Sequence, residues 1–426
     1  MNLFEHQKKA LEQTANQNRV AYYLDMGLGK TFVGGEKMDK LKAKVNLVVC
    51  QKSKVQDWIE HFFTHYGQYL IYNLTDKIEL EKFLRWNSEL FNKNIIGVIN
   101  YDLIFRRPEL SRLKDFTLML DESSLVQNEN SKRSRFILKK LNPINVILLS
   151  GTPTGGKYEK LWSQCKLLGW NISKKAFWDT YVEYHFDDRN GFPFKVIDGY
   201  KNVERLKCKL REHGAIFMKS EEVFDLPSQI DSNIYVPTTK EYRKFRKDAI
   251  ITFDGTEFTE FVGDTILTKM LYERMLCGFA NEDKLAALRD LLNSTDDRVI
   301  IFYNFTAEVE ALREICKELN REYSIVNGSR KDLVCYENFE DSVTLIQYQA
   351  GAMGLNLQKA NKIVYFTPPL SSELFEQSKK RIHRIGQDKS CFYYYLICRN
   401  SIEEKIYHTL AMRKNYTERL FENEQD

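Results

Sequence analysis

The feature that most constrains the fold is a series of short, almost uninterrupted apolar runs separated by longer stretches with helical patterning. The runs in the first half of the chain cover residues 20–24, 45–50, 95–99, 118–120 and 146–149. Those in the second half cover residues 299–303, 343–347, 362–366 and 392–397. Runs that are apolar throughout are typical of strands buried on both faces of a parallel sheet. Residues 307–319 carry an apolar stripe at helical spacing between two such runs.

Strand–helix–strand repetition in both halves predicts an α/β protein with two tandem parallel-sheet lobes. Residues 154–283 break this rhythm, because they are aromatic-rich and more helical, which indicates a helical insertion between the lobes; a specialised aromatic binding surface is the alternative. We expect a first lobe at 1–228 that includes the insertion from about residue 154. A linker with a helical protrusion is expected at 229–283, and a second lobe at 284–426 that ends in a helix.

Composition narrows the functional classes. With 43% hydrophobic and 29% charged residues the chain has the make-up of a globular protein. It contains no apolar run near the roughly 20 residues that cross a bilayer, and its first residues do not resemble a signal peptide. The eight cysteines are scattered without a C-x-x-C pair, so we expect reduced thiols and no structural zinc. The net charge of +4 permits nucleic-acid binding through local basic surface.

Polar motifs follow several of the apolar runs, where a parallel sheet gathers its ligands. The first is a glycine-rich turn with Gly27, Gly29, Lys30 and Thr31, directly after the run at 20–24. Glycines let backbone N–H groups approach a phosphate at a helix N-terminus, the lysine reaches the β- and γ-phosphates, and the threonine hydroxyl binds Mg²⁺. The first glycine of a full P-loop pattern is replaced by Leu24. A loop and helix start without function is the alternative.

A second motif, Asp121-Glu122, follows the run at 118–120. An aspartate at that strand tip would hold Mg²⁺, and the adjacent glutamate would orient and deprotonate an attacking water. The alternative is an ordinary acidic helix N-cap, since Ser123 and Ser124 come next.

A third motif lies about 350 residues after the phosphate-binding turn. The spacing predicts a helix that carries Arg381 and Arg384 on one face, with Gln377 one turn earlier. An arginine that reaches a γ-phosphate accelerates hydrolysis by about 10³–10⁵-fold. A solvated basic helix is the alternative, because Lys379 and Lys380 lie beside these arginines.

The order of these motifs resembles the Swi/Snf type of helicase superfamily 2, a group of DNA-dependent ATPases and DNA translocases, in a minimal prokaryotic or phage-like form. The resemblance extends over nearly the whole chain. It rests on D-M-G-L-G-K-T at 25–31, D-E-S-S at 121–124, S-G-T-P at 150–153, A-G-A-M-G-L-N-L at 350–357 and R-I-H-R-I-G-Q at 381–387. The last string is the most specific of them.

The resemblance implies two RecA-like lobes that use ATP and Mg²⁺. The implied ATP-binding residues are Gln7, Asp25, Met26, Gly27, Leu28, Gly29, Lys30 and Thr31. The implied catalytic residues are Lys30, Asp121, Glu122, Arg381 and Arg384, with Thr31 and Asp121 as magnesium ligands. The residues implied to couple the ATP state to DNA are Ser150, Thr152, Gly354, Asn356 and Gln377. The implied DNA contacts are Lys52, Lys54, Asn304, Phe305, Arg330 and Gln349.

We therefore expect an ATP-driven motor that translocates along DNA, mainly duplex DNA, with little sequence preference. The resemblance places it in the cytoplasm of a bacterial or phage-infected cell, or in the nucleus of a eukaryote, with replication, recombination or repair proteins as partners. Two alternatives stay open: a strand-separating DNA or RNA helicase, and an ATP-gated nucleic-acid-binding protein that does not turn over productively.

Overall fold

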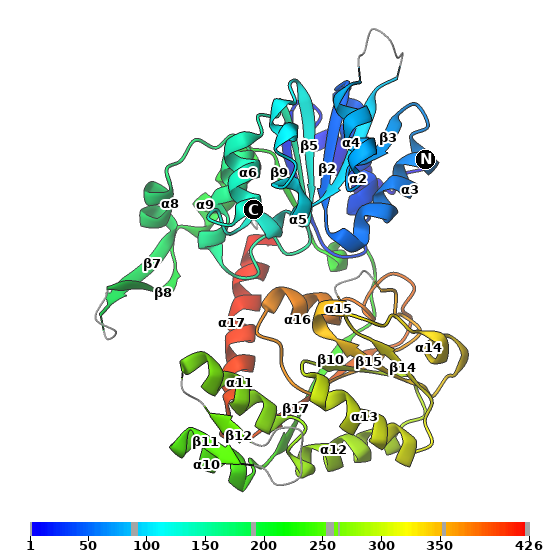
Figure 1. Ribbon diagram of the computed structural model, residues 1–426, viewed down its shortest axis with the longest axis vertical. Coiled ribbons are helices and arrows are strands. Elements are labelled where there is room, and N and C mark those ends of the chain that lie inside the picture. The colour runs from blue at the N-terminus through cyan, green and yellow to red at the C-terminus, as the bar shows by residue number, and fades with distance from the viewer. Residues whose placement is uncertain are drawn as a thin grey trace. The chain divides into compact units, whose positions relative to one another are not determined.

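The structure is a computed structural model of the chain, and it describes residues 2–86, 93–188, 193–252, 260–262, 265–351 and 355–421 (Figure 1). The chain divides into two compact units. The first contains Met1–Val223 and Asn415–Asp426, and the second contains Phe224–Lys414.

The first unit is built on a seven-stranded sheet of order β3-β4-β2-β5-β6-β1-β9, in which neighbouring strands are parallel. Its strands are β1 (Arg19–Leu24), β2 (Val45–Cys50), β3 (Leu70–Asn73), β4 (Ile95–Asn100), β5 (Phe116–Asp121), β6 (Asn145–Ser150) and β9 (Ala215–Met218). Every residue of β4 and β6 is buried, as expected for strands covered on both faces. The five strands predicted in the first half are confirmed, whereas β3 and β9 were not predicted.

Nine helices accompany this sheet within the described residues of the first unit. They are α1 (Glu5–Gln13), α2 (Lys30–Leu41), α3 (Val55–His65), α4 (Lys77–Leu84), α5 (Tyr101–Ile104), α6 (Lys132–Lys140), α7 (Trp162–Leu167), α8 (Lys174–Tyr181) and α9 (Val203–Glu212). An antiparallel hairpin of β7 (Val182–Asp187) and β8 (Phe194–Tyr200) stands away from the main sheet beyond α8 (Figure 1). The expected helical insertion therefore also contains a pair of strands.

The second unit is built on a six-stranded parallel sheet of order β10-β17-β16-β13-β15-β14. Its strands are β10 (Gln229–Val236), β13 (Val299–Tyr303), β14 (Tyr323–Val326), β15 (Val343–Gln347), β16 (Lys362–Tyr365) and β17 (Cys391–Cys398). The four strands predicted in the second half are confirmed. The sheet also takes in β10, which comes from the segment assigned to a linker on sequence grounds.

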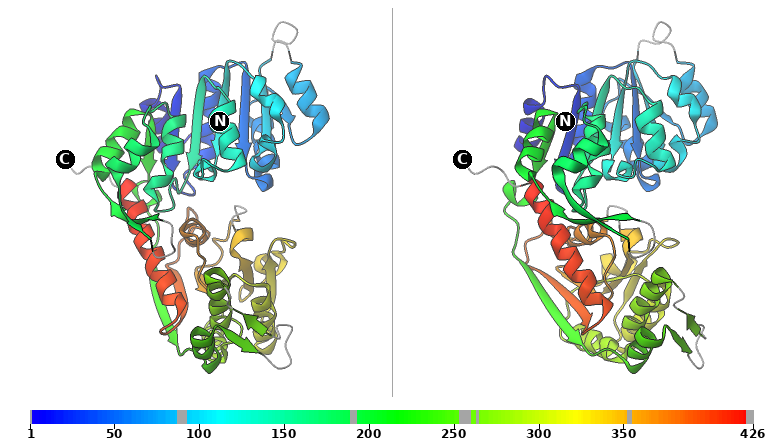
Figure 2. Two further views of the ribbon diagram at one scale, coloured as in Figure 1. Left: turned by 60° about the vertical axis from the view of Figure 1, so that its left-hand side comes forward. Right: turned by 90° about the vertical axis from the view of Figure 1, so that its left-hand side faces the viewer.

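The helices of this unit follow the same α/β alternation. They are α10 (Lys240–Asp248), α11 (Ile266–Cys277), α12 (Glu282–Asn293), α13 (Thr306–Glu318), α14 (Val334–Asn338), α15 (Tyr348–Gly351), α16 (Ser372–Lys379) and the greater part of α17 (Ile402–Phe421). Helix α17, drawn in red in both views of Figure 2, belongs to the second unit as far as Lys414 and to the first unit from Asn415 onward. A two-stranded hairpin of β11 (Ile250–Thr252) and β12 (Glu260–Val262) lies between α10 and α11 in sequence. The helix predicted at 307–319 is confirmed as α13.

Two further sequence expectations concern the whole chain. All eight cysteines are reduced thiols, six of them buried. Among the described residues, no helix has both the length and the apolar character that a bilayer crossing requires.

Candidate functional site

The loop between β1 and α2 has the geometry of a phosphate-binding turn. Gly27 and Gly29 have φ values of 88° and 73°, in the left-handed region that favours glycine, and Gly29 is the N-cap of α2. The Lys30 ammonium donates hydrogen bonds to the backbone oxygens of Leu24, at 2.9 Å, and Asp25, at 3.2 Å. The first N–H groups of α2 and a lysine therefore meet at one turn, which is an arrangement that binds anions.

The side chain of Gln7 fixes this loop to the start of α1. Its amide nitrogen donates to the Leu28 oxygen at 3.1 Å, and its amide oxygen accepts from the Phe4 nitrogen at 2.9 Å. The residue is 3% exposed, and a Cβ atom on Gly29 would lie 2.3 Å from the Gln7 amide nitrogen. Only glycine fits at position 29. His6, which is not among the predicted site residues, also contacts the Leu28 oxygen at 3.0 Å.

Asp25 fixes the other side of the loop. One carboxylate oxygen accepts from the Met26 nitrogen at 2.9 Å, and the other accepts from the Ser220 hydroxyl at 2.9 Å. Ser220 follows β9, a strand that the sequence did not reveal, so its part in the loop could not be foreseen.

The two predicted carboxylates lie at the end of β5, between β2 and β6 in the sheet. The Trp58 indole nitrogen donates to the Asp121 carboxylate at 2.9 Å, and the Tyr101 hydroxyl donates to its backbone oxygen at 2.9 Å. Burial raises the pKa of Asp121, whereas the Trp58 hydrogen bond and the charges of Lys30 and Lys54 oppose that rise. Lys30 therefore lies near enough to Asp121 to act on its charge, as a common nucleotide site requires.

Glu122 has an unusual backbone. Its φ of 55° and ψ of 61° place a non-glycine residue in the left-handed region, which costs of order 1–2 kcal/mol, and strained residues of this kind are enriched at functional sites. The Ser150 hydroxyl, at the end of the neighbouring strand β6, donates to the Glu122 carboxylate at 3.3 Å. That hydroxyl in turn accepts from the Thr152 nitrogen at 3.2 Å. The structure thus brings together Glu122, Ser150 and Thr152 through hydrogen bonds.

A polar groove of about 500 Å³ opens at the ends of β2, β3 and β4. Its lining includes one predicted DNA contact, Lys52, together with Val55, Gln56, Asn73, Thr75, Asn100, Asp102, Leu103 and Arg106. Lys54 lies beside Lys52 in a short 3₁₀ turn and forms an ion pair with Asp57 at 2.6 Å. Asn100 and Arg106 are not among the predicted site residues, although Asn100 directly follows the apolar run at 95–99.

In the second unit the predicted helix around Arg381 and Arg384 is wrong. Helix α16 ends at Lys379, and both arginines lie in the turns that follow. The Arg381 backbone oxygen accepts from the Leu357 nitrogen at 3.2 Å, and so has a partner far away in sequence where an α-helix would supply the nitrogen four residues later. Arg381 is 2% exposed, whereas Arg384 is half-buried, and its burial lowers the pKa of its guanidinium.

The turn places Arg384 beside another predicted residue. Its guanidinium donates to the side-chain oxygen of Asn356. The Gln387 side-chain amide stabilises the turn, because its nitrogen donates to the backbone oxygens of Gln358 at 3.1 Å and Ala360 at 2.8 Å. Gln377 lies on α16 and is buried. Gly354 lies outside the described residues.

The remaining predicted DNA contacts are spread over the second unit. The Asn304 amide donates to the Thr367 and Pro368 backbone oxygens, at 3.1 and 3.0 Å, and the Arg274 guanidinium lies over the Phe305 ring at 5.0 Å. Gln349, on α15, is exposed. Arg330 is exposed and forms an ion pair with Asp332 at 2.6 Å. Their roles stay predictions.

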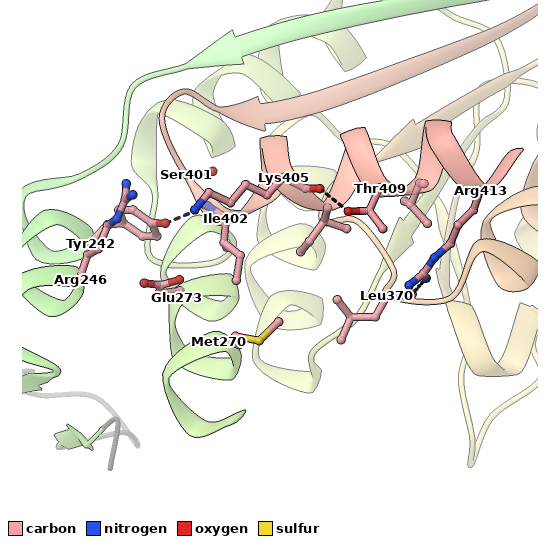
Figure 3. Close-up of a pocket in the computed structure, with 12 residues that line it drawn as sticks. Tyr242, Arg246, Met270, Glu273, Leu370, Ser401, Ile402, Lys405, Thr409 and Arg413 are labelled. Carbon is pink, nitrogen blue, oxygen red and sulfur yellow. Dashed lines mark hydrogen bonds between the residues drawn. The ribbon is translucent and has the colours of Figure 1, made fainter. Parts of the chain in front are cut away.

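Two other features of the second unit lie apart from the predicted residues. A pocket of about 460 Å³ between α10, α11 and α17 contains none of them (Figure 3). The ligand atoms of Cys277, Cys398 and Glu403 lie within 4.8 Å of one another. The fully buried Lys284 ammonium donates to that Glu403 carboxylate at 2.7 Å. The carboxylate is therefore already paired with a cation, and we do not assign a metal site to this cluster.

Comparison with known proteins gives a family. The SNF2-related domain matches residues 10–282, and the helicase conserved C-terminal domain matches residues 283–386. The ISWI chromatin-remodeling complex ATPase ISW1 of Saccharomyces cerevisiae is 25% identical over 92% of this chain and 38% of its own length. An uncharacterized ATP-dependent helicase of Mycoplasma pneumoniae is 25% identical over 90% of this chain and 38% of its own length.

This chain thus spans about two fifths of the length of these curated relatives. Among solved structures, the Sulfolobus solfataricus SWI2/SNF2 ATPase core in complex with dsDNA is 20% identical. The match covers 98% of this chain and 92% of the other, with a TM-score of 0.45. Because the first family match alone covers more than half of the residues, the chain belongs to the SNF2-related family, with a helicase conserved C-terminal domain after it.

Proposed function

We propose that this protein is an ATP-driven motor that couples ATP hydrolysis to translocation along duplex DNA. The observation that carries the proposal is the convergence, at one edge of the first sheet, of a glycine turn with Lys30, a half-buried aspartate and a strained glutamate. Family membership supports it, since an ISWI ATPase and an ATP-dependent helicase are similar to this chain over 92% and 90% of its length.

The glycine turn and the start of α2 bind the triphosphate. Lys30 exchanges its two neutral carbonyl acceptors for phosphate oxygens, because the negative charge of a phosphate attracts the ammonium more strongly than an uncharged carbonyl does. Gln7, Asp25 and their partners keep the loop open for this exchange, since they fix its two sides to α1 and to the segment after β9.

Asp121 and Thr31 supply the oxygen ligands that Mg²⁺ prefers, a carboxylate and a hydroxyl. Mg²⁺, when bound, neutralises charge on the phosphate oxygens. Trp58 donates to one oxygen of Asp121 and so fixes the plane of that carboxylate. Glu122 orients a water for attack and accepts its proton, with its carboxylate held by Ser150.

Arg384 stabilises the charge that develops on the γ-phosphate, and Asn356 holds its guanidinium ready. Lys52 and Arg106, in the groove at the ends of β2 to β4, bind DNA phosphates. The affinity for DNA therefore depends little on sequence and falls as the salt concentration rises. The Mycoplasma relative supports a bacterial setting, in which the motor works in the cytoplasm with replication, recombination or repair proteins.

Phosphate release measured without nucleic acid, and with single-stranded DNA, duplex DNA or RNA, tests the proposal. Duplex DNA is expected to stimulate the wild type most strongly, and Lys30→Ala or Glu122→Gln to abolish that stimulation. Greatest stimulation by RNA or single strands would support a strand-separating helicase. Binding to DNA that responds to ATP without phosphate release would support an ATP-gated binding protein.

A further inference from the structure

Gln164 is a polar residue that no motif includes and that the fold buries completely. It lies on α7 and is 0% exposed. Its amide oxygen accepts from the Ser123 hydroxyl at 2.8 Å and from the Tyr23 hydroxyl at 3.0 Å. Its amide nitrogen donates to the Pro153 backbone oxygen at 2.7 Å. One side chain therefore joins three segments that end or follow β1, β5 and β6.

The chemistry of these partners fixes the orientation of the amide. A backbone carbonyl can only accept a hydrogen bond, so the nitrogen must face Pro153 and the oxygen must face the two hydroxyls. Both hydroxyls then donate. Each partner is itself buried, and so losing the amide would leave Pro153, Ser123 and Tyr23 with unmade hydrogen bonds away from water.

Two of these contacts reach the proposed catalytic loops. Ser123 directly follows Glu122, whose left-handed backbone needs support from its surroundings. Pro153 directly follows Thr152, which binds Ser150, which in turn binds the Glu122 carboxylate. Gln164 thus closes a ring of contacts that starts and ends at Glu122.

We propose that Gln164 is a positioning residue for Glu122, which holds the loops after β5 and β6 in fixed register so that the carboxylate stays aimed at the attacking water. This inference rests on the proposed ATPase function. A buried amide that only filled the core would affect stability alone, whereas a positioning residue changes kcat and leaves ATP binding nearly unaltered.

The test is duplex-stimulated ATP turnover in Gln164→Leu, Ser123→Ala, the double variant, and the control Tyr23→Phe. Gln164→Leu is expected to lower kcat at least about tenfold, with KM for ATP within about twofold of wild type. Because Gln164 and Ser123 act through one link, the double variant should be no slower than Gln164→Leu. Tyr23→Phe leaves the links to Ser123 and Pro153 intact and should retain wild-type kcat.

Gln164→Glu covers the case in which Gln164→Leu fails to fold. A protonated glutamate can donate to Pro153, but an ionised one cannot. Its kcat relative to wild type should therefore fall as pH rises, in protein that thermal unfolding shows to be folded. Wild-type kcat in folded Gln164→Glu at a pH where the introduced carboxyl group is ionised would overturn the inference, as would equal losses in Tyr23→Phe. A wild-type protein without any ATP turnover would instead overturn the proposed function.

Discussion

Replacing Trp58 by phenylalanine removes one hydrogen bond from the proposed magnesium ligand and keeps an aromatic ring in the core. The indole nitrogen donates to the Asp121 carboxylate at 2.9 Å, and Trp58 is 2% exposed. A hydrogen bond to a charged acceptor contributes about 1.5–3 kcal/mol, and removing such support from a metal ligand typically costs about 10–100-fold in metal affinity or activity. Trp58→Phe should therefore need about 10–100-fold more Mg²⁺ for half-maximal ATP turnover.

The same substitution has a defined effect on pH dependence. Burial already raises the pKa of Asp121, and the Trp58 hydrogen bond opposes that rise by stabilising the ionised form. Removing the donor raises the pKa further. Because the ionised carboxylate binds the metal, activity is present above this pKa and lost as pH falls through it. The acidic limb of the kcat/KM profile should therefore move to higher pH.

The assay is ATP turnover over a range of Mg²⁺ concentrations at several pH values. Trp162→Phe is the control for the loss of an indole N–H, since its indole nitrogen donates to the Ile172 backbone oxygen at 2.9 Å, at a site that does not touch Asp121. Thermal unfolding shows that both variants are folded at the assay temperature. If Trp58→Phe has the magnesium requirement and acidic limb of Trp162→Phe, the reasoning about Asp121 is refuted.

Three further predictions address other parts of the molecule. Arg384→Ala should keep ATP affinity and lower kcat by about 10³-fold or more, and loss of nucleotide binding with normal kcat would contradict its role. Lys284→Met should lower the free energy of unfolding by about 3–5 kcal/mol, because it leaves the buried Glu403 carboxylate without its cation. Denaturant titration measures this change. Adding Glu403→Gln to the Lys284→Met variant should restore part of the lost stability. Burial raises the pKa of Glu308 to about 7, so this carboxyl group binds a proton more tightly in the folded protein than in the unfolded chain. The free energy of unfolding should therefore fall by roughly 3 kcal/mol as the pH rises from about 4.5 to 7. Glu308→Gln should flatten that slope in chemical denaturation, and an unchanged slope would contradict the assignment.

The elements predicted most accurately from the sequence are the central strands, which are buried on both faces of the sheet. All nine apolar runs are strands, because a central parallel strand leaves no position for a polar alternation. The strands that were missed lack that signature. β10 is mostly exposed along its length, and β3 and β9 have only four residues each, so their patterns resemble those of loops. Parallel pairing then explains why the motifs after β1, β5 and β6 meet at one edge.

The wrong helix around Arg381 and Arg384 shows where local spacing fails. Two arginines three residues apart fit a helical face, but the bonds that decide the backbone come from distant residues. The Leu357 nitrogen donates to the Arg381 backbone oxygen, and the Gln387 side chain donates to the Ile382 backbone oxygen at 3.3 Å. The contacts of Gln164 could not be predicted for a related reason, since its partners Tyr23 and Ser123 lie 141 and 41 residues away in the sequence.

Displacement of a third strand from a DNA triplex is the measurement that bears most directly on the proposed motor. A triplex tail on a duplex track is released only by a protein that moves along the duplex, with no need to separate its two strands. We expect the wild-type protein to release the third strand with ATP and Mg²⁺, and Glu122→Gln to bind the same track without releasing it. Third-strand retention by wild-type protein that hydrolyses ATP on this duplex would contradict the account.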